Sequence, residues 1–60
     1  MKYTAKFYFN RKPFVCDYKE EEINASNVIE RDAKVIARKK ELNAYMVHIF
    51  SEKGKYLRTL

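Results

Sequence analysis

The reactive side chains of this 60-residue chain are few, and their spacing gives little support to catalysis. Cys16 and His48, the only cysteine and the only histidine, could in principle form a nucleophile and base pair. Nothing in the surrounding sequence would activate the thiol, and a lone cysteine is commonly a small buried hydrophobic residue. Ser26 and Ser51 fall at expected cap and turn positions, which already account for them. We therefore predict that the chain is not an enzyme and has no catalytic residue.

Sites for metals and phosphates are also poorly supported by the residue types present. One cysteine and one histidine cannot form a metal cage of the cysteine or histidine type. The acidic run at residues 20–22 lacks further oxygen ligands at the spacing of a calcium loop. Gly54 is the only glycine, so a glycine-rich phosphate loop cannot form. We expect no metal, no cofactor and no small-molecule substrate.

Asp32 is the acid whose position most needs an explanation. The apolar residues on one side of a helix over residues 27–42, wound at about 100° per residue, are Val28, Ile29, Val35 and Ile36. Asp32 falls near the middle of that side, where a carboxylate must be paired or hydrogen-bonded. The expected partners are sheet residues, namely Tyr3, Tyr18, Tyr45 or Lys6. We predict that Asp32 has a structural role, in holding register or a partner, and does no chemistry.

Lys39 lies on the same side of this helix and also departs from the apolar pattern. We therefore expect the apolar stripe to be split between the core and its rim. The residues expected in the core are Ile29, Ala33, Ile36 and Ala37. The residues expected along the rim are Val28, Asp32, Val35 and Lys39. That rim is a candidate dimer or partner contact.

Hydrophobic periodicity predicts four strands and one helix, in the order ββαββ. The expected strands are residues 2–10, 14–18, 44–50 and 56–60, with turns at residues 10–13 and 51–55. Asn27 with Glu30 three residues later resembles a capping box, and Asn43 is expected to end the helix. Gly54 suits the left-handed position of the second turn. We predict one two-layer α+β domain over residues 1–60, with the helix packed on one face of a four-stranded, mainly antiparallel sheet.

A single helix can cover only one face of such a sheet, so the other face must be left open. The residues expected on that face are Tyr8, Met46, His48 and Phe50. Exposed apolar patches of this kind usually mark an interface. We expect a homodimer contact there first, and a foreign protein partner second.

The chain carries a formal net charge of +5, which favours encounters with polyanions. The predicted topology returns the end of the helix to the first turn, so the cations expected to share one pole are Arg11, Lys12, Arg38, Lys39, Lys40 and Arg58. We expect the acidic run at the opposite pole. Such a cluster suits backbone phosphates. The alternative is a solvent-exposed helix end and turn that bind no ligand.

The chain shows no signal peptide, because Lys6 and Asn10 interrupt its first apolar run. No stretch approaches the roughly 20 apolar residues that a membrane span needs. A lone cysteine fits a reducing compartment. We expect a cytoplasmic protein that does not bind membranes.

The opening order of two strands and a helix, basic and with aromatic residues as in KFYF at residues 6–9, resembles small DNA-binding sheet domains that insert strands into the major groove. It is also similar to short accessory proteins of phages and plasmids, which often bind and block a host protein. The aromatic signature of RNA-binding sheets is absent, because KFYF lacks its glycines. Both resemblances concern the fold, which does not by itself assign a function.

We predict a small, basic, non-catalytic binding module, for which two functions remain open. The first is binding of DNA or RNA backbones by the cationic pole, with Tyr8 or Lys6 from the open face, and with affinity that falls steeply with salt. The second is a protein-binding regulator or inhibitor that acts through the open face or an edge strand. The charge favours the first function, and the apolar surface favours the second.

Overall fold

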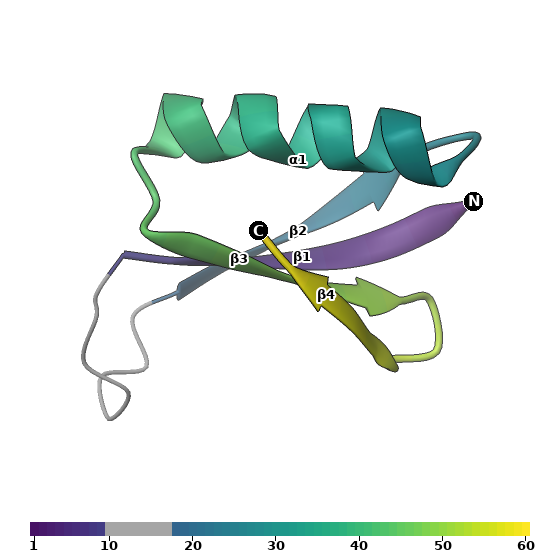
Figure 1. Cartoon of the computed structure of the whole chain (residues 1–60). Coiled ribbons are helices and arrows are strands. Elements are labelled where there is room, and N and C mark those ends of the chain that lie inside the picture. Colours follow the sequence, from purple (N-terminus) through teal and green to yellow (C-terminus); the bar gives the residue numbers. More distant parts are fainter. Residues whose placement is uncertain (10–17) are drawn as a thin grey trace.

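The computed structural model describes residues 1–9 and 18–60, which form a four-stranded sheet with one helix lying across it (Figure 1). The elements are β1 (Lys2–Tyr8), β2 (Tyr18–Asn24), α1 (Val28–Leu42), β3 (Met46–Ser51) and β4 (Tyr56–Thr59). The strand order is β2-β1-β3-β4, and every neighbouring pair is antiparallel. The predicted α+β fold and its ββαββ order are confirmed.

The end of the second strand was predicted wrongly. Of the expected strand at residues 14–18, only Tyr18 lies within the described residues, and β2 continues from there through the acidic run to Asn24. The glutamates are accommodated because β2 is an edge strand that meets lysines of β1. Glu20 lies 4.0 Å from Lys6 Nζ, and Glu22 lies 3.7 Å from Lys2 Nζ. Charged side chains on an edge strand also hinder pairing with other chains.

The core lies between the sheet and the helix, and β1 supplies its centre. Alternation sends Tyr3, Ala5 and Phe7 of β1 towards the helix, where all three are buried. The antiparallel register places Val47 and Ile49 of β3 beside them on the same face. The core also includes Ile23, Ala25 and Val35. Because β1 is paired on both sides, it anchors the whole sheet.

Local signals set the two ends of α1 and the last turn as the sequence predicts. Asn27 is the N-cap, and its Oδ1 accepts a hydrogen bond of 2.8 Å from the backbone N–H of Glu30. Asn43 ends the helix in the left-handed conformation, with φ of 56°. Gly54 has φ of 88°, a conformation that glycine adopts without a steric penalty. These three predictions are confirmed.

The expected face of α1 was wrong. Val35, which was expected on the rim, is fully buried, whereas Ile29 and Ile36 are 83% and 42% exposed. Arg31 is buried as well, so the side of the helix that faces the sheet includes a charged residue. The reason is that Val35 lies about 60° around the helix axis from both Asp32 and Arg38. Those two residues form ion pairs with opposite sides of the sheet, which fixes the rotation of the helix with Val35 facing the core.

Within the described residues, no helix combines the length and the apolar composition that a membrane crossing requires.

We expect the rotation of α1 to be visible in unfolding experiments. Val35→Ala should lower the free energy of unfolding by about 1.5–3 kcal/mol, because it removes methyl groups from a close-packed core. Ile29→Ala should change it by less than about 0.5 kcal/mol, because the side chain is solvent-exposed. Urea denaturation followed by circular dichroism measures both values. Equal losses in the two variants would contradict the observed helix face.

Candidate functional site

The face of the sheet that lies away from α1 is covered by no other element among residues 1–9 and 18–60 (Figure 1). Register decides which side chains meet on this open face. Lys6 of β1 lies opposite Glu20 of β2 on one side and His48 of β3 on the other. Tyr8 is likewise flanked by Tyr18 and Met46. The open face therefore collects the outward residues of three adjacent strands.

Five rings form a connected cluster on the open face, which we call the aromatic cluster: Tyr8, Tyr18, His48, Phe50 and Tyr56. Its shortest contact joins Tyr8 and His48, with ring centroids 5.0 Å apart and nearly perpendicular planes. The Phe50 and Tyr56 rings meet edge to face at 5.9 Å. Edge-to-face contacts stabilise the two rings and leave part of their faces uncovered. The cluster thus keeps aromatic surface available to a ligand.

Lys6 lies at the centre of this surface. Its ammonium is 4.9 Å from the centroid of the Phe50 ring and 5.4 Å from that of the Tyr18 ring. Glu20 is its only carboxylate partner among the described residues, and at 4.0 Å the two atoms are at the limit of an ion pair. Because 29% of the Lys6 side chain is exposed, the charge remains accessible beside the rings.

His48 is held by a chain of side-chain hydrogen bonds. Its Nδ1 lies 2.8 Å from Oγ1 of Thr59, which in turn lies 2.6 Å from the hydroxyl of Tyr56. These contacts join β3 to β4 across the open face and fix the orientation of two rings. They give His48 a structural function in the aromatic cluster.

The residues predicted for the interface lie together on the open face. Tyr8, Met46, His48 and Phe50 are all half-buried there. Sequence analysis missed Tyr18 and Tyr56 as members of the same cluster. The signal for Tyr56 was the short loop between β3 and β4, which sets their register. The signal for Tyr18 was weaker, because it depends on where β2 begins.

The cationic pole differs from its prediction, because Arg38 is neutralised. Its guanidinium donates to both carboxylate oxygens of Glu21, at 2.9 and 3.2 Å from Nε and at 2.9 Å from Nη2. Nη1 donates to Glu41 at 3.0 Å. The expectation that the acidic run and the helix end lie at opposite poles was therefore wrong. Hydrogen bonds from Arg38 lower the pKa of Glu21 from 4.5 to about 2, and a hydrogen bond from Lys19 contributes to a smaller extent.

The other members of the predicted pole are also separated. Arg58 contacts the N-terminal half of α1, where its Nη1 donates to Oδ2 of Asp32 at 2.6 Å. Lys39 and Lys40 remain together at the helix end, and neither has an ion-pair partner in the described part of the chain. Arg11 and Lys12 lie outside the described residues.

Asp32 bridges two arginines. Oδ1 accepts from Nε of Arg31 at 3.0 Å, and Oδ2 accepts from Arg58. Arg31 is only 5% exposed, and its guanidinium lies 5.0 Å from the centroid of the Tyr3 ring. The partners expected for Asp32, a tyrosine hydroxyl or Lys6, were the wrong ones. The carboxylate compensates a buried positive charge and links α1 to β4.

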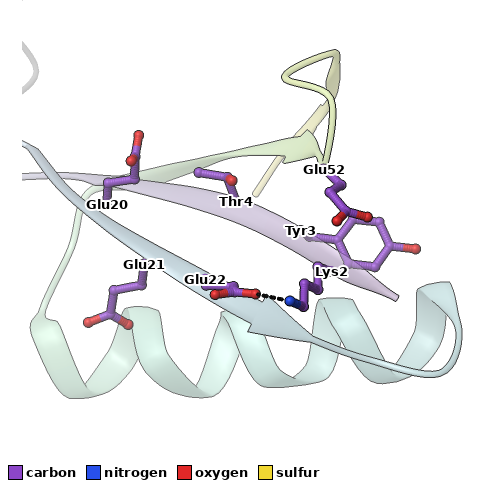
Figure 2. A pocket seen from close by; sticks show the side chains of 7 residues that line it. All are labelled: Lys2, Tyr3, Thr4, Glu20, Glu21, Glu22 and Glu52. Atoms are coloured by element: carbon purple, nitrogen blue, oxygen red, sulfur yellow. Dashed lines mark ion pairs between the residues drawn. The ribbon is translucent and has the colours of Figure 1, made fainter.

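A depression of about 410 Å³ lies over β1, between β2 and the turn after β3, and is lined by Lys2, Tyr3, Thr4, Glu20, Glu21, Glu22 and Glu52. Figure 2 shows that Glu20 points away from the helix while Glu21 points towards it, so these acids do not converge on one point. In the described ranges, no three His, Cys, Asp or Glu side chains are grouped so that they could hold a metal ion. Four of its seven lining residues are glutamates, so the depression is acidic.

Comparisons with protein-family models, with curated proteins and with solved structures found no match to this chain. Its function must therefore be argued from the geometry of its own surfaces.

We expect the Glu21–Arg38 pair to contribute stability that depends on pH. Because the folded-state pKa of Glu21 is below its unfolded value, this contribution is complete above pH 4.5 and is lost as pH falls towards 2. Glu21→Gln should lower the free energy of unfolding by about 1 kcal/mol at pH 6. At pH 2 the variant and the parent chain should converge. A difference that persists unchanged at pH 2 in urea titrations would contradict this origin.

We expect Asp32→Asn to lower the free energy of unfolding more than Arg58→Ala does. It leaves the buried guanidinium of Arg31 without a counter-charge, which should cost about 2–3 kcal/mol of unfolding free energy. Arg58→Ala removes a side chain that is 49% exposed, and should cost less than about 1 kcal/mol. Denaturant midpoints of the two variants measure the contrast. A larger loss in Arg58→Ala would contradict this expectation and would show that Asp32 stabilises the fold mainly through its contact with Arg58 of β4.

Proposed function

We propose that this chain is a non-catalytic module of the cytoplasm that binds single-stranded nucleic acid on its open face. The observation that carries the proposal is the aromatic cluster with the ammonium of Lys6 at its centre. Proteins that bind single strands combine rings on which bases stack with cations that meet the backbone. Duplex DNA offers no unstacked bases to such a surface, so we expect single strands to be preferred.

The charges around the cluster indicate the path of the strand. Glu20 and Glu22 lie on the β2 side of the open face and would repel phosphates. Tyr56, which is 52% exposed, lies on the β4 side with no acidic residue opposite it in the register. We place the bases over the rings of β3 and β4 and over Tyr18 at the start of β2, with a phosphate near Lys6.

This mode predicts a weaker salt dependence than the cationic pole would give. One or two phosphate contacts should lower affinity by about three- to sevenfold between 50 and 200 mM salt. Stacking on rings, which salt does not screen, would provide the rest of the affinity. The net charge of +5 would mainly increase the rate of encounter.

A second candidate function uses the same surface, as a contact with protein. Met46, opposite Tyr8 in the register, adds apolar area to the aromatic cluster, as at the centre of many protein interfaces. A second copy of the chain, or a protein that this chain regulates, would then cover the face. In the first function nucleic-acid bases contact Tyr18 and Tyr56, and in the second a protein surface covers them.

Fluorescence anisotropy with labelled 12-nucleotide dT and dA single strands and a matched duplex tests the proposed function. Tyr56→Ala and Tyr18→Ala should each weaken single-strand binding by about tenfold, because stacking contributes about 1–3 kcal/mol per base. Tyr56→Phe and Tyr18→Phe keep the rings and should bind within about twofold of the parent chain.

Ile29→Ala, on the opposite side of the molecule, is the matched control and should bind normally. Equal affinity for the duplex, or no effect of either alanine variant, would contradict stacking on the open face. Light scattering during size-exclusion chromatography distinguishes the second candidate. A stable dimer that Phe50→Ala dissociates would assign the face to self-association.

A further inference from the structure

We infer that the groove at the C-terminal end of α1 binds an acidic peptide segment of a partner protein, one that carries aliphatic or aromatic side chains between its carboxylates. The groove has a volume of about 400 Å³ and is lined by Ile36, Lys39, Lys40, Asn43, Ala44 and Leu60. It lies on the helix side of the sheet, away from the aromatic cluster. The inference is therefore independent of the proposed nucleic-acid function.

Backbone hydrogen bonds hold both walls of the groove. On the helix side, the N–H of Ala44 donates to the carbonyl of Lys39 at 3.0 Å, and the N–H of Asn43 donates to that of Lys40 at 3.2 Å. On the sheet side, Leu60 and Val47 exchange two hydrogen bonds of 2.8 and 2.9 Å. Because the walls are already fixed, the groove loses little conformational entropy when a ligand binds.

The floor of the groove is apolar and continues along the helix. Ile36 is 42% exposed, and Leu60 is packed against the core with part of its side chain open. Ile29, seven residues before Ile36 and so on the same side of α1, is 83% exposed. This strip of aliphatic surface suits side chains of a peptide, and a sugar-phosphate backbone has no group that would bury it.

The positive charge beside the groove indicates a negatively charged ligand. Arg31, Lys34 and Arg38, on other sides of the same helix, each contact a carboxylate of this chain. Lys39 and Lys40 contact none within residues 1–9 and 18–60. Two uncompensated ammonium groups therefore flank an apolar floor. Carboxylates interspersed with apolar side chains complement both features.

The test is fluorescence polarisation with a labelled 12-residue peptide that alternates Glu with Leu and Phe, together with amide chemical-shift mapping of the protein. We expect shifts at Ile36, Lys39, Lys40, Asn43 and Ala44, and little change on the open face. Lys39→Glu with Lys40→Glu should weaken binding at least tenfold. Lys53→Glu with Lys55→Glu, the same charge change in the exposed turn before β4, should weaken it less than threefold.

Ile36→Ser tests the apolar contact without changing the charge, and it should also weaken binding at least fivefold. Its circular dichroism spectrum should be unchanged, because the side chain is exposed. Oligoglutamate of the same length should bind at least tenfold more weakly than the alternating peptide. Equal binding of oligoglutamate would overturn the apolar floor as part of the site. Absent binding, equal effects of the two charge-reversal pairs, or chemical shifts confined to the open face would overturn the inference. It would also be overturned if sedimentation showed that a second copy of the chain occupies the groove.

Discussion

The rotation of α1 about its own axis is the constraint on which both surfaces of the molecule depend. Arg38 holds one flank of the helix to Glu21 of β2, and Asp32 holds the other flank to Arg58 of β4. Val35 lies between these two residues around the axis and is driven onto the sheet. Each pair is only partly buried and is modest in energy by itself. Together they select one helix face from several that differ little in apolar content.

This rotation has a consequence for the composition of the core. It places Arg31 under the helix, so that its charge must be compensated by Asp32 and its planar group must lie against the Tyr3 ring. It also turns Ile29 and Ile36 into solvent. A chain of this size has little apolar surface to spare, because small domains bury only about 60% of their unfolded surface. Exposing two isoleucines therefore lowers stability, and a binding function for that strip would explain why they are tolerated.

The sequence predicts the elements better than it predicts their faces. Alternation in β1, the Asn27 cap, the Asn43 stop and Gly54 each act through local backbone geometry, so each can be recognised without the fold. The face of α1 cannot, because Val28, Ile29, Val35 and Ile36 give a broad apolar arc that allows more than one rotation. The choice is made by Glu21 and Arg58, which approach from distant parts of the chain. The continuation of β2 through residues 20–22 was missed because glutamates have low strand propensity, and only their pairing with lysines of β1 makes the strand favourable.

The same ion pairs change what the net charge implies about ligands. Each arginine of the described ranges, namely Arg31, Arg38 and Arg58, is committed to a carboxylate of the chain itself. Arginine is the side chain best suited to bidentate phosphate recognition, so these residues cannot serve that purpose without breaking contacts that position the helix. Among the described residues, the accessible positive charge is left to lysines, which attract anions but discriminate little between them. Selectivity must then come from the surface beside each lysine. Lys6 lies among rings, which favours bases, whereas Lys39 and Lys40 flank aliphatic side chains, which favour a peptide.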